Sequence, residues 1–339
     1  MIIPIKTVTG TYDIVLERGA LKNAGNYLYL NRRVLIVTDS GVPTQYAQTV
    51  ASFCKKPIII TIPKGENSKQ SDTLKLLLKT MVENGFTRTD CVVAVGGGVV
   101  GDLSGFAASV YMRGIDFYNI PTTVLSQVDS SIGGKTAINF MGYKNIVGAF
   151  YPPRCVLIDT ETLNTLPARQ VANGLAEAVK MAATCDAELF SIFEEENILK
   201  PDTLQKIIAG SLNIKKQVVE EDERENGLRR VLNFGHTLAH AIESVNGMDN
   251  FYHGESVAMG MIPMCSAQAR KRLLAVLKNL GLPVTFKGNT NELIAACRHD
   301  KKTSGENITI VYLTDIGKFE LRTISFLELE NIIRSVNAE

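Results

Sequence analysis

Three of the four histidines in this chain, His236, His240 and His253, lie within eighteen residues of one another. His236 and His240 are four residues apart in an apolar, helix-like segment, so both imidazoles should project from one face of a helix. His253 follows a break at Asn246-Gly247, where that helix is expected to end. Imidazole is the commonest neutral ligand for zinc-like ions, and catalytic zinc sites typically have three protein ligands and one open position. The cluster predicts a metal site, although buried structural histidines would give the same pattern.

A carboxylate and an ammonium group, Glu177 and Lys180, lie one helical turn apart in an apolar segment. On a helix surface such a pair contributes only a few tenths of a kcal/mol. The apolar neighbours predict that this pair faces the interior. There the desolvation penalty of two charges can exceed their attraction, so a buried pair is expected to have a function. Glu177 is therefore a natural third ligand beside His236 and His253.

A glycine-rich turn at residues 96–102 follows the apolar run Cys91–Val95 and opens an apolar helix. Glycines with this spacing let a backbone approach a pyrophosphate at a helix N-terminus. The turn departs from the usual dinucleotide fingerprint because it follows about the third strand, and a plain tight turn remains an alternative. A second loop at residues 64–69 could offer a carboxylate to a ribose hydroxyl and an ammonium group to phosphate.

Polar groups are dense between Arg113 and Asn145 in an otherwise apolar region. A solvated loop would explain one exposed lysine, but it does not explain Lys135 beside two glycines and Asp129. We expect an anion to bind in loops at the strand ends of this region.

The bulk composition narrows the class of protein. The chain has 339 residues, 45% of them hydrophobic and 21% charged, with a net charge of +1. This charge gives no electrostatic case for nucleic acid or an anionic membrane as partner. Six scattered cysteines without a Cys-x-x-Cys pair favour reduced thiols and a cytoplasmic location. The sequence shows no secretion signal, and its longest apolar stretch is too short to span a bilayer.

Two domains are expected from the length and from a change of pattern along the chain. Apolar runs at 33–38, 57–62, 91–95 and 154–158 lack alternation, which predicts strands buried on both faces of a mainly parallel sheet. Long helical patterns follow at 170–184, 202–220, 228–245 and 255–280, and a late strand pair at 308–313 and 317–322. We expect an α/β dinucleotide-binding domain at 1–163 and a mainly α-helical metal- and substrate-binding domain at 164–339.

Together these segments resemble the 3-dehydroquinate synthase family of the sugar phosphate cyclase superfamily. The resemblance runs from Lys64 to Lys302. Its most specific blocks are Gly-Gly-Gly-Val-Val-Gly-Asp at 96–102, Asp-Ser-Ser-Ile-Gly-Gly-Lys-Thr-Ala-Ile-Asn at 129–139, Leu-Asn-Phe-Gly-His-Thr at 232–237 and His-Gly-Glu at 253–255. It implies a cytoplasmic homodimer with NAD and zinc or cobalt. The implied reaction converts 3-deoxy-D-arabino-heptulosonate 7-phosphate to 3-dehydroquinate and phosphate by oxidation, phosphate elimination, re-reduction and aldol closure.

The resemblance also assigns roles by position. The implied metal ligands are Glu177, His236 and His253. The implied NAD-binding residues are Asp39, Lys64, Gly65, Glu66, Asn67, Ser68, Lys69, Gly97, Gly98, Val99, Val100, Gly101, Asp102, Thr122, Thr123, Lys135, Lys144, Thr162, Leu163, Asn164 and Thr165. The implied substrate and proton-transfer residues are Asp129, Lys135, Asn145, Lys180, Lys215, Glu225, Arg229, Asn233 and His240, with Lys301 or Lys302 reaching the phosphate and Arg113 reaching it from a partner subunit.

Rival functions are a metal-dependent alcohol or glycerol dehydrogenase, another sugar phosphate cyclase, and a non-catalytic metal and nucleotide sensor. A dehydrogenase would not need cations such as Lys135, Lys215 and Arg229 for phosphate and carboxylate. Other cyclases usually alter blocks that are intact here, and a sensor would be expected to lose polar residues such as Lys180. Ala239 stands where the family more often has glycine, which changes no chemical group.

Overall fold

The computed structural model describes residues 1–225, 227–246, 250–286, 288–298, 303–304 and 307–337. The chain divides into two compact units, Met1–Pro167 and Ala168–Glu339. The expected domain boundary after residue 163 lies inside a 3-10 helix, η5 (Thr160–Thr165), slightly before this division.

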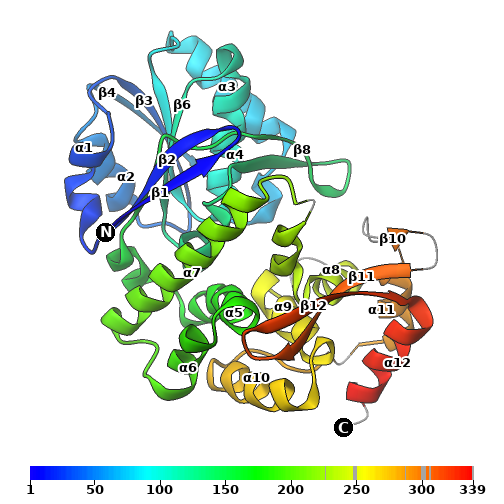
Figure 1. The fold of residues 1–339 in the computed structure, drawn as a ribbon. Helices are drawn as coiled ribbons and strands as arrows, with labels where there is room; N and C mark the ends of the chain where they lie inside the picture. Colours follow the sequence, from blue (N-terminus) through cyan, green and yellow to red (C-terminus); the bar gives the residue numbers. More distant parts are fainter. Residues whose placement is uncertain (226, 247–249, 287, 299–302, 305–306, 338–339) are drawn as a thin grey trace. The chain divides into compact units, whose positions relative to one another are not determined.

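The first unit contains a seven-stranded sheet in the order β1-β2-β9-β6-β5-β3-β4 (Figure 1). All neighbouring pairs are parallel except β1 and β2, which form an antiparallel N-terminal hairpin that the sequence patterns did not predict. The bounds are β1 Ile2–Thr7, β2 Gly10–Leu16, β3 Arg33–Asp39, β4 Lys56–Ile62, β5 Cys91–Gly96, β6 Asp116–Pro121 and β9 Cys155–Ile158. The expected mainly parallel sheet is thus confirmed.

Both faces of this sheet are covered by apolar side chains. Val34 and Ile36 of β3 belong to one buried cluster, whereas Leu35 and Val37 belong to another. Because successive side chains of a strand point to opposite faces, this split shows burial on both sides. The unbroken apolar runs of the sequence have this physical origin.

The strand order places a topological switch point between β3 and β5. After β3 the chain adds β4 on one side, then returns to add β5 on the other side of β3. In open parallel sheets, ligands bind outside the carboxyl ends of the strands at such a point. Asp39 ends β3, and the glycine turn begins at Gly96, the last residue of β5. The glycine turn therefore follows a strand at the switch point although it does not follow the first strand.

The remaining segments of the first unit are helices that cover the sheet and a separate two-stranded sheet (Figure 1). The helices are η1 Ala20–Asn23, α1 Ala24–Tyr27, α2 Thr44–Ala51, η2 Glu66–Ser68, α3 Ser71–Glu83, α4 Gly98–Val110, η3 Tyr111–Arg113 and the π-helical turn η4 Ser126–Ser130. Residues 135–150, which were expected to form loops, instead include a two-stranded hairpin, β7 Lys135–Phe140 and β8 Tyr143–Phe150. Its turn contains Met141 with φ 49° and Gly142 with φ 83°.

The second unit is mainly helical, as expected. Its helices are α5 Ala168–Cys185, α6 Ala187–Glu195, α7 Pro201–Glu221, η6 Leu228–Asn233, α8 His236–Asn246, α9 His253–Met261, η7 Ile262–Met264, α10 Ala267–Asn279, α11 Thr290–Cys297 and α12 Phe326–Asn337. A three-stranded antiparallel sheet contains β10 Thr303–Ser304, β11 Asn307–Asp315 and β12 Lys318–Ser325. None of the helices that the structure describes could cross a membrane.

Two of the long helices expected from the sequence are interrupted, so these predictions were wrong. The segment 228–245 divides at Gly235, whose φ of 78° is left-handed and disfavours residues with a Cβ. The segment 255–280 divides after Pro263, and Ser266 caps the next helix by accepting a hydrogen bond from the Ala269 amide at 3.3 Å. Apolar periodicity persisted across both breaks because these residues stay in the core.

Candidate active site

The residues proposed for NAD follow the carboxyl ends of several parallel strands of the first unit. The glycine turn follows β5, the 64–69 loop follows β4, Thr122 and Thr123 follow β6, and η5 follows β9. Residues far apart in the sequence therefore meet at one edge of the sheet. A cavity of about 330 Å³ lies at η5, lined by Thr162, Asn164 and Thr165 together with Tyr46.

The glycine turn brings backbone close to neighbouring segments. A Cβ at Gly98 would lie 3.0 Å from the Ser130 hydroxyl, and one at Gly96 would lie 2.7 Å from a methyl group of Val100. Glycine therefore lets the turn pack tightly before α4. The first amide groups of this helix have no partner within the helix, which suits a phosphate group.

A buried cation, Lys69, joins three of the predicted loops. Its ammonium group donates to the carboxylate of Asp102 on α4 and to the amide oxygen of Asn145 on β8. Asn139, which sequence reasoning did not assign to the site, supports this cluster. Its side chain donates to Glu66 Oε1 at 2.8 Å and accepts from the Asn145 amide at 2.9 Å. Its place in the polar segment between Arg113 and Asn145 was the available signal.

Three predicted site residues have left-handed backbone. Arg113, Asn145 and Glu225 have φ of 66°, 55° and 65°, an uncommon conformation for residues with a Cβ. This backbone conformation costs free energy, and residues that adopt it cluster at binding and catalytic sites. Asparagine adopts this conformation more readily than other residues, so tertiary structure has to hold the backbone of Arg113 and Glu225 in particular.

The second unit brings Glu177, His236 and His253 together from three helices, with one possible ligand atom of each within 4.8 Å of the others. Glu177 Oε1 lies 3.7 Å from His236 Nε2 and 3.5 Å from His253 Nε2. Glu177 Oε1 is buried and accepts no hydrogen bond, whereas Oε2 accepts from Lys180. A buried carboxylate oxygen facing two imidazole nitrogens fits a divalent ion of the zinc type.

Each of the two histidines also contacts an oxygen through Nδ1. His236 Nδ1 lies 3.2 Å from the carbonyl oxygen of Phe234, and His253 Nδ1 lies 2.8 Å from Glu243 Oε1. Such contacts orient metal-binding histidines. Sequence reasoning missed Glu243, although its spacing of seven from His236 places both on one face of α8.

Two close backbone approaches set the helix positions around this triad. A Cβ at Gly254 of α9 would lie 1.9 Å from the carbonyl oxygen of Asn173 on α5, and one at Gly260 would lie 2.1 Å from the carbonyl oxygen of Gly235. Arg169 on α5 adds a two-point ion pair with Glu255, at 2.7 and 2.9 Å. Glycine at these two positions lets α9 approach its neighbours closely enough to place His253 beside Glu177.

The charges in the triad shift two pKa values in opposite directions. Burial opposes ionisation of Glu177, but the Lys180 ammonium group and His253 outweigh it and lower the pKa of Glu177 to about 2. Burial likewise disfavours the charged imidazolium of His253, but Glu177 and Glu243 raise the pKa of His253 to about 10. These shifts favour an ionised Glu177 carboxylate and a protonated His253 imidazole, so a metal ion that bound here would have to displace a proton from His253.

Further cations and amides of the second unit lie on helices that pack around α5. Lys180 and Lys215 are buried, at 2% and 4% exposure. Arg229 is buried in η6, where its guanidinium donates to the carbonyl oxygen of Glu223 at 2.5 Å. The amide of Asn233 donates to Glu225 Oε1 at 2.6 Å, so the structure joins a residue predicted to contact the substrate to one predicted to handle protons.

Other predicted residues are more exposed. Lys135 and Lys144 are exposed on the β7–β8 hairpin, Arg113 is exposed at the end of η3, and His240 is exposed on α8. The His240 ring lies 5.6 Å from that of His236, centroid to centroid. The predicted phosphate contacts Lys301 and Lys302 lie outside the described residues.

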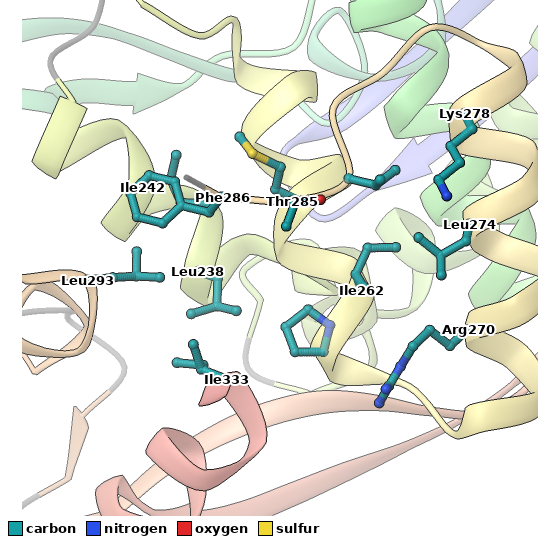
Figure 2. Close-up of a pocket in the computed structure, with 13 residues that line it drawn as sticks. Leu238, Ile242, Ile262, Arg270, Leu274, Lys278, Thr285, Phe286, Leu293 and Ile333 are labelled. Atoms are coloured by element: carbon teal, nitrogen blue, oxygen red, sulfur yellow. The ribbon is translucent and has the colours of Figure 1, made fainter. Parts of the chain in front are cut away.

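The second unit also contains a cavity of about 270 Å³ (Figure 2). Its wall is mostly apolar and includes Leu238, Ile242, Ile262, Leu274, Phe286, Leu293 and Ile333. Leu238 and Ile242 lie on the side of α8 away from His236. None of the predicted site residues lines this cavity, so it is separate from the metal triad.

The fold is shared by solved structures of sugar phosphate cyclases. The chain is similar to the structure of 2-deoxy-scyllo-inosose synthase complexed with carbaglucose-6-phosphate, NAD+ and Co2+, with a TM-score of 0.88, 27% identity, and coverage of 99% of this chain and 100% of that one. It is also similar to 2-epi-5-epi-valiolone synthase from Streptomyces hygroscopicus subsp. jinggangensis with NAD+ and Zn2+ bound, with a TM-score of 0.86, 28% identity, and coverage of 96% and 97%.

The sequence narrows this class to one family. A sequence model of the N-terminal part of 3-dehydroquinate synthase matches residues 59–173, and one of its C-terminal part matches residues 174–303. The 3-dehydroquinate synthase of Streptococcus suis is 41% identical over 340 residues, covering 94% of this chain and 95% of that protein. This chain belongs to the 3-dehydroquinate synthase family.

Proposed function

We propose that this chain converts 3-deoxy-D-arabino-heptulosonate 7-phosphate to 3-dehydroquinate and phosphate, as a carbon–oxygen lyase of aromatic amino acid biosynthesis. Membership of the 3-dehydroquinate synthase family across both units supports this activity. The observation that carries the proposal is the buried, unsatisfied Glu177 oxygen that faces two histidines. We further propose a cytoplasmic homodimer in which Arg113 serves the partner's site.

The cofactors we propose are NAD and a zinc or cobalt ion. When bound, NAD would supply hydride chemistry, taking a hydride from the carbon that bears a substrate hydroxyl and later returning it, while the ion would act as a Lewis acid on the hydroxyl oxygen. NAD would be held at the carboxyl edge of the sheet by the glycine turn, the 64–69 loop and η5. Glu177, His236 and His253 would hold the ion.

The remaining side chains would bind and orient the substrate. Lys135, Lys180 and Lys215 supply ammonium groups for phosphate and carboxylate. Arg229 supplies a planar guanidinium for the substrate carboxylate. Its hydrogen bond to the Glu223 carbonyl oxygen holds one side of the guanidinium in place. Asn233 is paired with Glu225, so these two would position a proton-transfer group together. The substrate loses a proton beside the new ketone, phosphate leaves, and the opened product closes by an aldol step.

The balance of nucleotide and phosphate tests this proposal. The enzyme with NAD and zinc, given the heptulosonate phosphate, should release phosphate in many-fold excess over NAD. The concentration of NADH, measured by its absorbance, should not exceed the enzyme concentration. Steady accumulation of NADH in step with substrate loss would instead favour an alcohol dehydrogenase. No phosphate release from this substrate, with release from other sugar phosphates, would favour another cyclase.

A further inference from the structure

The orientation of His253 needs an explanation because this ligand is the least enclosed of the three. Its side chain is 35% exposed, compared with 12% for His236 and 1% for Glu177. It is also the first residue of α9. Its ring faces the His236 ring at 5.2 Å between centroids, but its shortest described polar contact is between His253 Nδ1 and Glu243 Oε1, at 2.8 Å.

The chemistry of this contact determines where the imidazole carries its proton. An ionised carboxylate only accepts hydrogen bonds, so Nδ1 of His253 must donate. In the neutral ring the lone pair then lies on Nε2, the atom that is 3.5 Å from Glu177 Oε1. We propose that Glu243 is a positioning residue for the metal site: it holds the tautomer and rotation of His253 that present Nε2 to the ion. This proposal rests on the proposed metal-dependent function.

A comparison of the two histidines indicates why a carboxylate stands at this position. His236 Nδ1 faces a neutral carbonyl oxygen in a backbone turn, whereas His253 Nδ1 faces a carboxylate that is only 11% exposed. A carboxylate partner orients the ring and also makes it a stronger donor to a metal ion. The more exposed ligand therefore has the stronger partner. Loss of such a partner typically costs 10–100-fold in metal affinity.

Zinc affinity, measured by competition with a chromogenic chelator, tests the proposal without an activity assay. Glu243→Ala should weaken zinc binding by about 10–100-fold. Glu243→Gln should retain part of the affinity because its amide oxygen can still accept from Nδ1. Glu188→Gln on α6 is the control, because it removes an equal charge from an exposed position away from the triad. The visible spectrum of bound cobalt should change in Glu243→Ala and not in the control.

The outcomes separate the two proposals. Zinc affinity within twofold of the unaltered chain in both Glu243 variants, with an unchanged cobalt spectrum, would overturn the positioning role alone. No zinc binding by the unaltered chain would overturn the metal-dependent function as well. If Glu243→Ala does not fold, ¹⁵N NMR of the unaltered chain, labelled at histidine and loaded with zinc, tests the proposal by showing which ring nitrogen of His253 binds the metal. Metal on Nε2 and a proton on Nδ1 of His253 support the proposal, and metal on Nδ1 overturns it.

Discussion

The backbone contact at Gly254 makes a quantitative prediction about the metal site. In Gly254→Ala the added Cβ would lie 1.9 Å from the Asn173 carbonyl oxygen, whereas ordinary contact begins near 3.4 Å, so α9 must move by about 1.5 Å. No rotamer relieves this clash, because it joins a Cβ to a backbone atom. Metal–ligand distances tolerate only about 0.2 Å. His253 is the adjacent residue, so zinc affinity should fall by at least tenfold.

The same substitution should lower stability. Overpacking of a tight contact costs about 1–3 kcal/mol. In a unit of this size each kcal/mol lowers the melting temperature by about 2–4 °C, so we expect a decrease of about 2–12 °C. Ser256→Ala, two residues along α9, is the matched control, since its buried hydroxyl lacks a hydrogen bond and its loss should be neutral. Thermal melts with and without zinc measure both effects, and a Gly254→Ala protein with unchanged melting and zinc affinity would refute the reasoning.

Further predictions concern the metal, the first unit and the subunit arrangement. His253→Ala should lose zinc binding and turnover. The zinc affinity of the unaltered chain should fall as pH falls, because the raised pKa of His253, about 10, makes zinc compete with a proton. Zinc binding that is independent of pH, measured by calorimetry, would contradict this. Without metal, the His253 shift adds stability that is complete below about pH 6.5 and is lost as pH rises toward 10. Lys69→Met should weaken NAD binding in a fluorescence titration because it leaves Asp102 without its ammonium partner, and an unchanged affinity would remove Lys69 from the cofactor site. Inactive Arg113→Ala and Lys135→Ala chains, mixed with subunit exchange confirmed, should recover activity through hybrid dimers; absence of recovery would contradict a shared site.

Part of this protein could be predicted from its sequence because the signals are local. Apolar runs without alternation specify strands covered on both faces, and Val34 to Val37 lie in such a strand. A histidine pair four residues apart specifies one helix face, and the structure brings His236 beside Glu177 and His253. The glycines of the turn permit a close backbone approach, and the structure places Gly98 close to the Ser130 side chain.

Other features depend on contacts between distant residues, which local patterns do not encode. The breaks at Gly235 and after η7 interrupt segments whose apolar periodicity continues. Gly235 and Pro263 are local signals for a break, but the close approach of Gly260 on α9 to the Gly235 carbonyl oxygen is a tertiary contact. The hairpin at residues 135–150 carries mixed polar and apolar residues without clear alternation. Each of its strands is formed by backbone pairing with the other strand.

The sequence by itself determined the family, the parallel sheet and the residue types for a metal ion and a phosphate group. Only the tertiary structure decided which oxygen orients each histidine. Glu243 looks like an ordinary acidic residue of an amphipathic helix, and it contacts His253 because that histidine starts a different helix that packs against α8. Metal chemistry depends on atomic distances between helices, and these distances are set by close packing of residues that are remote in the chain.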